Sequence, residues 1–106
     1  MSNGVRARLR WLTAAEGGRQ TPPPGPEYST VARFEALRDR WPNEAWSVVV
    51  SLAATAPSQR VVEARVRMLV RDAPPELLTP GSRFDLFEGS RRVAEGEVLQ
   101  STGTSG

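Results

Sequence analysis

The stretch that decides the fold lies near the start of the chain and reads Val5-Arg-Ala-Arg-Leu-Arg-Trp11. Apolar and basic side chains alternate at every position in it. Successive side chains of a β-strand point to opposite faces, so this two-residue period is typical of a strand with one face in a core and the other in water. The stretch therefore predicts a strand over residues 5–11, with Arg6, Arg8 and Arg10 in a row on its outer face.

Five further segments carry strand signals. Val62, Ala64, Val66 and later apolar residues alternate with charged ones, which predicts the longest strand of the chain, running to about residue 71. The run Val48-Val49-Val50 is β-branched throughout and predicts a short strand covered on both faces. The predicted segments are 28–35, 46–53, 62–71, 83–88 and 91–100.

Breaker residues separate these segments. Residues 13–26 contain a proline-rich run, which cannot pair inside a sheet because proline lacks the backbone donor, so we expect a long exposed loop. Residues 36–43 predict a turn or a short helical piece, and residues 73–82 predict an irregular crossing. Gly89-Ser90 is a two-residue connection consistent with a tight hairpin.

Six short strands without a convincing helix predict an all-β fold, a small six-stranded antiparallel β-barrel, in which closure removes exposed edges. In the last strand Ala94, Gly96 and Val98 share one face, and such small side chains fit a narrow interior. We expect a flexible N-terminus over residues 1–4, a single domain over 5–100 and a disordered tail over 101–106.

Three tryptophans supply much of the aromatic surface. Trp11 and Trp46 are predicted to lie in the core, with a cost of about 3–5 kcal/mol for Trp46→Ala. Trp41, next to Pro42, is the best candidate of the three for an exposed contact residue, and packing over a barrel end is the favoured alternative.

Composition excludes several kinds of chemistry. The chain has 106 residues and a net charge of +2, and it contains no His, Lys or Cys. A Walker-type phosphate loop, Schiff-base chemistry, His-activated nucleophiles and thiolate metal sites are therefore ruled out. We predict no enzyme activity, no cofactor, no nucleotide and no metal. A deep pocket that holds two close carboxylates would reverse the prediction of no enzyme activity. The absence of a long apolar segment or a signal-like region predicts a cytoplasmic protein without membrane contact.

Two motifs at opposite ends of the chain resemble a known domain. The run Glu16-Gly-Gly-Arg-Gln-Thr21 follows the first strand, and residues 78–99 contain Pro80-Gly81 and Phe84-Asp-Leu-Phe-Glu-Gly-Ser-Arg-Arg-Val-Ala-Glu-Gly-Glu-Val98. Together they resemble the opening strand, first loop and closing hairpin of the C-terminal barrel domain (domain 3) of elongation factor Tu.

The resemblance implies a six-stranded antiparallel barrel that helps to hold the T stem of aminoacyl-tRNA, with GTP hydrolysis belonging to a separate domain. In that family's pattern Arg19 matches an arginine that contacts the tRNA backbone, and Glu88 with Gly89 match hairpin positions near the same stem. Ser90 replaces a family glycine. The family's Tyr-Arg-Pro-Gln-Phe-x-Phe strand is reduced here to residues 27–34, without its arginine, proline and glutamine.

Two interpretations stay open for Gly17-Gly18-Arg19. It is either a turn that needs glycine for positive φ, or a backbone nest whose guanidinium grips phosphate or carboxylate. The arginine rows are equally ambiguous. They are either solvated faces, paired across strands with Glu95 and Glu97, or a track for a phosphate backbone, the second row being Arg65, Arg67 and Arg71.

The leading functional prediction is a stand-alone, non-catalytic binding module of the translation-factor barrel type. A protein partner is favoured, because the net charge is low and the RNA-facing strand is reduced. The alternatives are structured RNA, such as a tRNA stem, and a decoy or immunity-like mimic of the elongation factor barrel. The candidate partner- or RNA-binding residues are Gly17, Gly18, Arg19, Gln20, Thr21, Glu88, Gly89, Arg91 and Arg92.

Overall fold

The computed structural model describes residues 4–18, 26–40, 45–52 and 60–99. Trp41, most of the expected flexible N-terminus and the expected tail lie outside these residues. Within the described ranges, three short 3-10 segments lie in the connections: η1 (Ala14–Glu16), η2 (Glu35–Arg40) and η3 (Pro75–Leu78). The strands of the described chain are β1 (Val5–Trp11), β2 (Glu27–Phe34), β3 (Trp46–Leu52), β4 (Val61–Met68), β5 (Arg83–Glu88) and β6 (Arg91–Val98).

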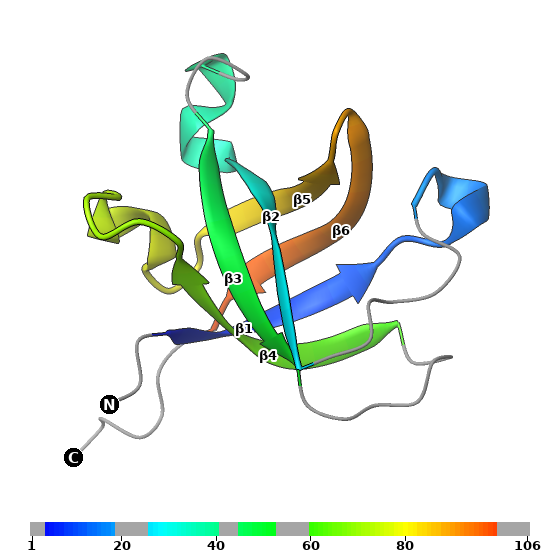
Figure 1. Ribbon diagram of the computed structural model, residues 1–106, viewed down its shortest axis with the longest axis horizontal. Coiled ribbons are helices and arrows are strands. Elements are labelled where there is room, and N and C mark those ends of the chain that lie inside the picture. The colour runs from blue at the N-terminus through cyan, green and yellow to red at the C-terminus, as the bar shows by residue number, and fades with distance from the viewer. Residues whose placement is uncertain (1–3, 19–25, 41–44, 53–59, 100–106) are drawn as a thin grey trace.

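The strands close into a barrel in the order β1-β4-β3-β2-β5-β6, and every neighbouring pair is antiparallel (Figure 1). Closure comes from β1, which bonds to β4 on one side and to β6 on the other. Arg8, for example, lies opposite Glu63 on β4 and opposite Glu97 on β6. The structure thus confirms the predicted all-β, six-stranded antiparallel barrel and brings the first and last strands together.

The two ends of the barrel differ in what they carry. At the hairpin end, β1, β3 and β5 finish, and η1 and the Gly89-Ser90 turn follow β1 and β5. At the opposite end, which we call the η3 end, lie η2, η3 and the ends of the described chain. Figure 1 shows η1 and the hairpin on one side of the molecule, and η3 with both termini on the other.

The core fills the barrel with side chains from alternate strand positions. Ala7, Leu9 and Trp11 of β1 are buried, as the alternation predicts. Gly96 lies where a Cβ would come within 2.4 Å of Phe84 Cζ, so the predicted small inward residues are present in β6. All three residues of Val48-Val49-Val50 are buried, which confirms a strand covered on both faces.

Three details differ from the predictions. β4 ends at Met68 and is no longer than β2 or β6, because the chain turns away over the next residues. Trp46 is only partly buried and packs against the core from its margin, so it is not a core residue. A register shift between Leu86 and Phe87 lets β6 bury both Val93 and Ala94.

No helical segment in the described residues is both long and apolar enough to span a membrane.

Candidate functional site

The structure brings the described candidate residues to the same end of the barrel. Leu12, just after β1, donates its backbone N–H to the carbonyl of Val93 near the start of β6, at 2.9 Å. The Gly17-Gly18 turn and the β5–β6 hairpin are therefore neighbours at the hairpin end. Arg19, Gln20 and Thr21 lie outside the described residues.

The Gly17-Gly18 turn uses its own backbone donors. Thr13 and Glu16 form a capping box around η1, and Gly17 then turns the chain at φ +93°. The N–H of Gly17 donates to the Ala14 carbonyl at 3.0 Å, and that of Gly18 donates to the Thr13 carbonyl at 2.8 Å. Both N–H groups are satisfied within the turn, so this pair offers no backbone nest for an anion. The turn interpretation accounts for both glycines, and a role in partner binding stays a prediction.

The turn is also anchored to the barrel below it. A Cβ on Gly18 would lie 2.4 Å from the backbone oxygen of Leu12, so the chain approaches itself too closely there for any side chain. Glu16 accepts a hydrogen bond from the backbone N–H of Thr13 at 2.8 Å, and this bond is the main reason that the pKa of Glu16 lies below its ordinary value.

The hairpin residues are mostly engaged. Gly89 has φ +63° in the two-residue loop, and a positive φ at the first loop position is what a type II′ turn needs. The phenol of Tyr28 donates a hydrogen bond to Glu88 Oε2. Arg92 pairs with Glu95 at 3.2 Å. Arg91 is exposed and forms no ion pair with any described residue, which leaves its guanidinium available to solvent or a ligand.

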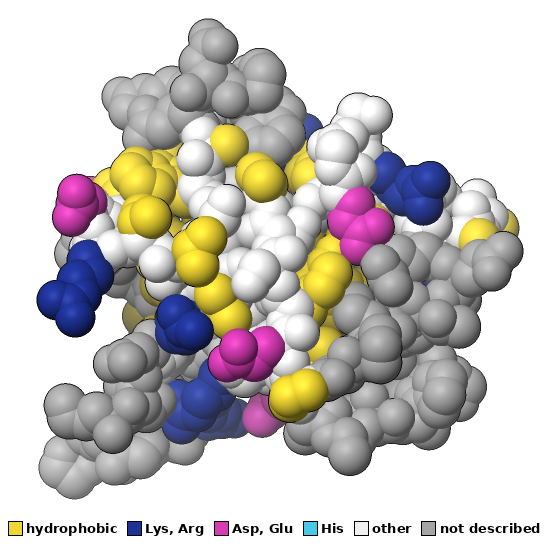
Figure 2. Space-filling model, in the orientation of Figure 1, with side chains coloured by type: hydrophobic (Ala, Val, Ile, Leu, Met, Phe, Trp, Pro, Cys, Tyr) yellow, Lys and Arg dark blue, Asp and Glu magenta, His cyan; other side chains and the backbone are white. Residues whose placement is uncertain are grey.

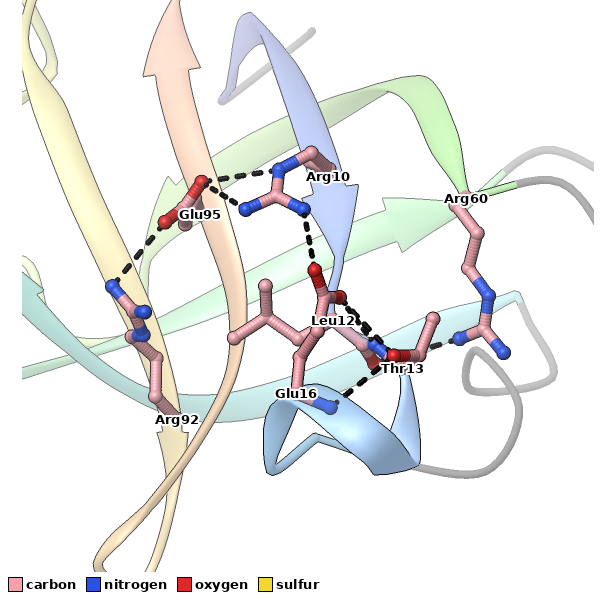
Figure 3. Close-up of polar contacts among 7 residues, drawn as sticks. All are labelled: Arg10, Leu12, Thr13, Glu16, Arg60, Arg92 and Glu95. Atoms are coloured by element: carbon pink, nitrogen blue, oxygen red, sulfur yellow. Dashed lines mark hydrogen bonds and ion pairs between the residues drawn. The ribbon is translucent and has the colours of Figure 1, made fainter.

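The arginines of β1 are neutralised by glutamates on neighbouring strands. Arg6 pairs with Glu63 at 2.9 Å, and Arg8 pairs with Glu97 at 3.0 Å. Arg10 donates twice to Glu95, and this pairing raises its pKa further (Figure 3). The predicted cross-strand pairing with Glu95 and Glu97 is therefore confirmed, and a phosphate would have to compete with a carboxylate at each arginine of this row.

The Arg10–Glu95 pair belongs to a longer chain of ion pairs across the outer surface. Figure 3 shows Glu95 between Arg10 and Arg92, with Arg10 reaching on to Glu16. On the far side Arg92 approaches Asp85 at 3.8 Å, and Asp85 pairs with Arg33 of β2 at 2.6 Å. Asp85 and Glu95 also line an open groove of about 380 Å³. Each of the two carboxylates is paired with two arginines, so both belong to the ion-pair network.

The second arginine row has a different environment. Arg65 donates to the Gly4 carbonyl at 3.1 Å, but Arg65, Arg67 and Arg71 form no ion pair with any carboxylate in the described residues. Arg67 and Arg71 line a groove of about 630 Å³ at the η3 end. The other residues of this η3-end groove are Val5, Met68, Leu69, Val70, Ala73 and Leu78.

The rim of the η3-end groove is apolar and exposed. Leu69 is 52% exposed and Val70 is 47% exposed, and with Val61 they are the exposed large hydrophobic side chains of the described chain. Leu69 still donates its N–H to Ser47 at 3.0 Å, but Ala73 then donates to the Val70 carbonyl and closes a turn. Figure 2 shows hydrophobic side chains gathered on the side where Figure 1 draws the β4–β5 connection, with charged side chains at the margin.

Sequence reasoning missed this groove because it continued the β4 alternation through Val70. The signal against that continuation is the breaker-rich run Arg71-Asp-Ala-Pro-Pro75 directly afterwards.

Among the described residues, no group of three or more His, Cys, Asp or Glu side chains is placed to hold a metal ion. Comparison of the chain with protein-family models and with curated protein sequences finds no match.

Proposed function

We propose that this chain is a non-catalytic binding module whose partner is a protein, and that the partner docks at the η3-end groove. The observation that carries the proposal is the exposure of Leu69 and Val70 at 52% and 47%, side by side on the rim of a groove. Exposed apolar surface framed by polar residues is typical of protein interaction sites, because covering it removes apolar area from water.

The electrostatics of the barrel also support a protein partner over a nucleic acid. Nucleic-acid binding depends on free cations that replace counterions along the phosphate backbone. On β1 each arginine already has a carboxylate, and the chain as a whole carries only +2. The closed barrel agrees with the resemblance to the elongation factor Tu domain, which we retain within the proposal together with a cytoplasmic location.

The test is a capture experiment with extract of the cells that encode the chain. The immobilised chain is compared with the double variant Leu69→Ser/Val70→Ser, and bound proteins are identified by mass spectrometry. We expect at least one protein that the chain retains and the double variant loses, and that binds again when purified. Arg83→Gln, a single exposed change outside the groove, is the control and should retain it. Identical capture by all three proteins would contradict the proposal.

Structured RNA is the second candidate, and the unneutralised row Arg65, Arg67 and Arg71 is the observation that favours it. Filter binding of tRNA at increasing salt tests it. Affinity that falls steeply with salt, and that is reduced by Arg67→Gln/Arg71→Gln but not by Leu69→Ser/Val70→Ser, would favour RNA. Absence of binding at low salt would remove this candidate.

A further inference from the structure

We infer that the η3-end groove recognises a short peptide segment that combines carboxylates with aliphatic side chains. The inference rests on the proposed function and specifies the chemistry of the partner. It starts from the two cations in the lining. Arg67 and Arg71 both line the groove, whereas no acidic residue does.

Arg67 and Arg71 differ in this respect from the arginines of β1. On β1 each arginine is matched by a glutamate within 3.0 Å. Arg67 and Arg71 have no such counter-charge in the described chain. Asp72 and Glu76 are close in sequence, but they do not line the groove and form no ion pair with described residues. The missing anion is therefore one that a ligand can bring.

Carboxylate is the anion that suits this position. A guanidinium presents a planar fork of donors that matches a carboxylate with two parallel hydrogen bonds. The floor and rim between the arginines are aliphatic, from Val5 and Met68 to the exposed Leu69 and Val70. A ligand that is acidic throughout would leave this apolar surface in water, so aliphatic side chains next to the carboxylates complete the match.

The size of the groove indicates a short segment. Its volume of about 630 Å³ falls within the ~300–1,000 Å³ of sites that enclose drug-sized ligands. Such a volume accepts a few side chains of a peptide and not the face of a whole domain. The β4–β5 connection, which supplies Leu69, Val70, Arg71, Ala73 and Leu78 to the groove, is described throughout.

The experiment is selection from a displayed library of random ten-residue peptides on the wild-type chain and, in parallel, on Leu69→Ser/Val70→Ser. We expect peptides that need the wild-type groove to be enriched in Asp and Glu together with Leu, Ile, Val or Met. The affinity of the best selected peptide is then measured by fluorescence anisotropy. It should fall about tenfold or more in Arg67→Gln/Arg71→Gln, because that variant loses the charge-assisted hydrogen bonds to the peptide. Arg83→Gln also removes one positive charge but lies outside the groove, so it should leave the affinity unchanged.

A second variant separates the fork from the charge. Arg71→Lys keeps the positive charge at an exposed position but removes the fork, so it should weaken the same peptide by several-fold while the thermal melt stays unchanged. Full affinity in Arg71→Lys together with full affinity in the double glutamine variant overturns the inference.

Other occupants of the groove give different results. Concentration-dependent dimerisation in sedimentation, abolished by Leu69→Ser/Val70→Ser, would show that a second copy of the chain covers the groove and would overturn the inference. Selected peptides without an excess of acid, or no selectable peptide, would overturn it as well. In that case capture of a protein that depends on Leu69 and Val70 would still sustain the proposed function, so the two failures are distinguishable.

Discussion

Gly96 and Phe84 face each other across the β5–β6 pair so closely that the space of a Cβ on Gly96 is already taken. Such a Cβ would lie 2.4 Å from Phe84 Cζ and 2.9 Å from Leu9 Cδ2. Phe84 is 3% exposed and also packs against the Phe34 ring, with 5.6 Å between ring centroids. The ring therefore has little room to move, and the glycine is a packing requirement of the closed barrel.

Gly96→Ala should lower the free energy of unfolding by about 1–3 kcal/mol, the usual cost of forcing one more carbon into a packed interior. Urea denaturation measures the loss. The double variant Gly96→Ala/Phe84→Leu is the control, because the smaller side chain makes room for the methyl group. If the losses in the free energy of unfolding from Gly96→Ala and Phe84→Leu simply add, the contact between these residues is not the cause of the Gly96→Ala loss.

The two tryptophans on β1 and β3 should differ in their contribution to stability. Trp11 is 2% exposed, so Trp11→Ala should cost about 3–5 kcal/mol through the cavity that it leaves. Trp46 packs only at the margin of the core. Trp46→Ala should therefore lower the free energy of unfolding by less than Trp11→Ala does, that is, by less than about 3 kcal/mol. Equal losses in parallel urea titrations would contradict this order.

Ion pairs of different exposure should respond differently to salt. Asp85, whose side chain is 20% exposed, pairs with Arg33, and Asp85→Asn should cost about 0.5–1 kcal/mol. Glu63, at 59%, pairs with Arg6, and Glu63→Gln should cost less. In 1 M NaCl the Debye length is about 3 Å, so the Glu63 effect should vanish while part of the Asp85 effect persists. Glu76→Gln, which breaks no ion pair in the described chain, is the control.

Acid should open the capping box around η1. The pKa of Glu16 lies below its ordinary value of 4.5, because the backbone N–H of Thr13 donates to the carboxylate. A carboxyl group with a lowered folded-state pKa stabilises the fold above its unfolded pKa, and this contribution is lost as the pH falls through the folded value. The Thr13 amide resonance should therefore titrate below pH 4.5, and Glu16→Gln should abolish this titration. A midpoint at or above the ordinary value would contradict the assignment.

The exposed pair Leu69 and Val70 should be dispensable for folding. Leu69→Ser/Val70→Ser should change the free energy of unfolding by no more than about 0.5 kcal/mol per site, because about half of the surface of each residue stays in water in the folded chain. Thermal melting measures it. A large loss would show that the pair belongs to the core and would remove the basis of the proposed binding surface.

Alternation in the sequence was enough to predict which face of β1 is buried. Leu9 points inward and its neighbours Arg8 and Arg10 point outward, because a strand has only two faces. The partners of these arginines, Glu97 and Glu95, were also predicted, because closing the barrel places the first strand next to the last. The Arg33–Asp85 pair could not be predicted in this way. It depends on β2 lying next to β5, and no local pattern reports which strands become neighbours.

The η3-end groove escaped prediction for a related reason. Val70 occupies the next inward position of the β4 pattern, and a pattern of residue types cannot distinguish a buried valine from an exposed one. The turn that exposes it depends on the hydrogen bond from Ala73 to the Val70 carbonyl. The bulge that buries both Val93 and Ala94 was missed likewise, because it adds one residue to an otherwise regular alternation.

The pairing of β1 with β6 has a consequence for synthesis on the ribosome. The strand that completes the sheet, residues 91–98, is the last to emerge, and until it does β1 and β5 each keep an unpaired edge. A nascent chain that pauses after its fifth strand thus exposes two templates for pairing with a neighbouring chain. Slower translation through the β5–β6 hairpin should therefore give aggregation more time to compete with folding.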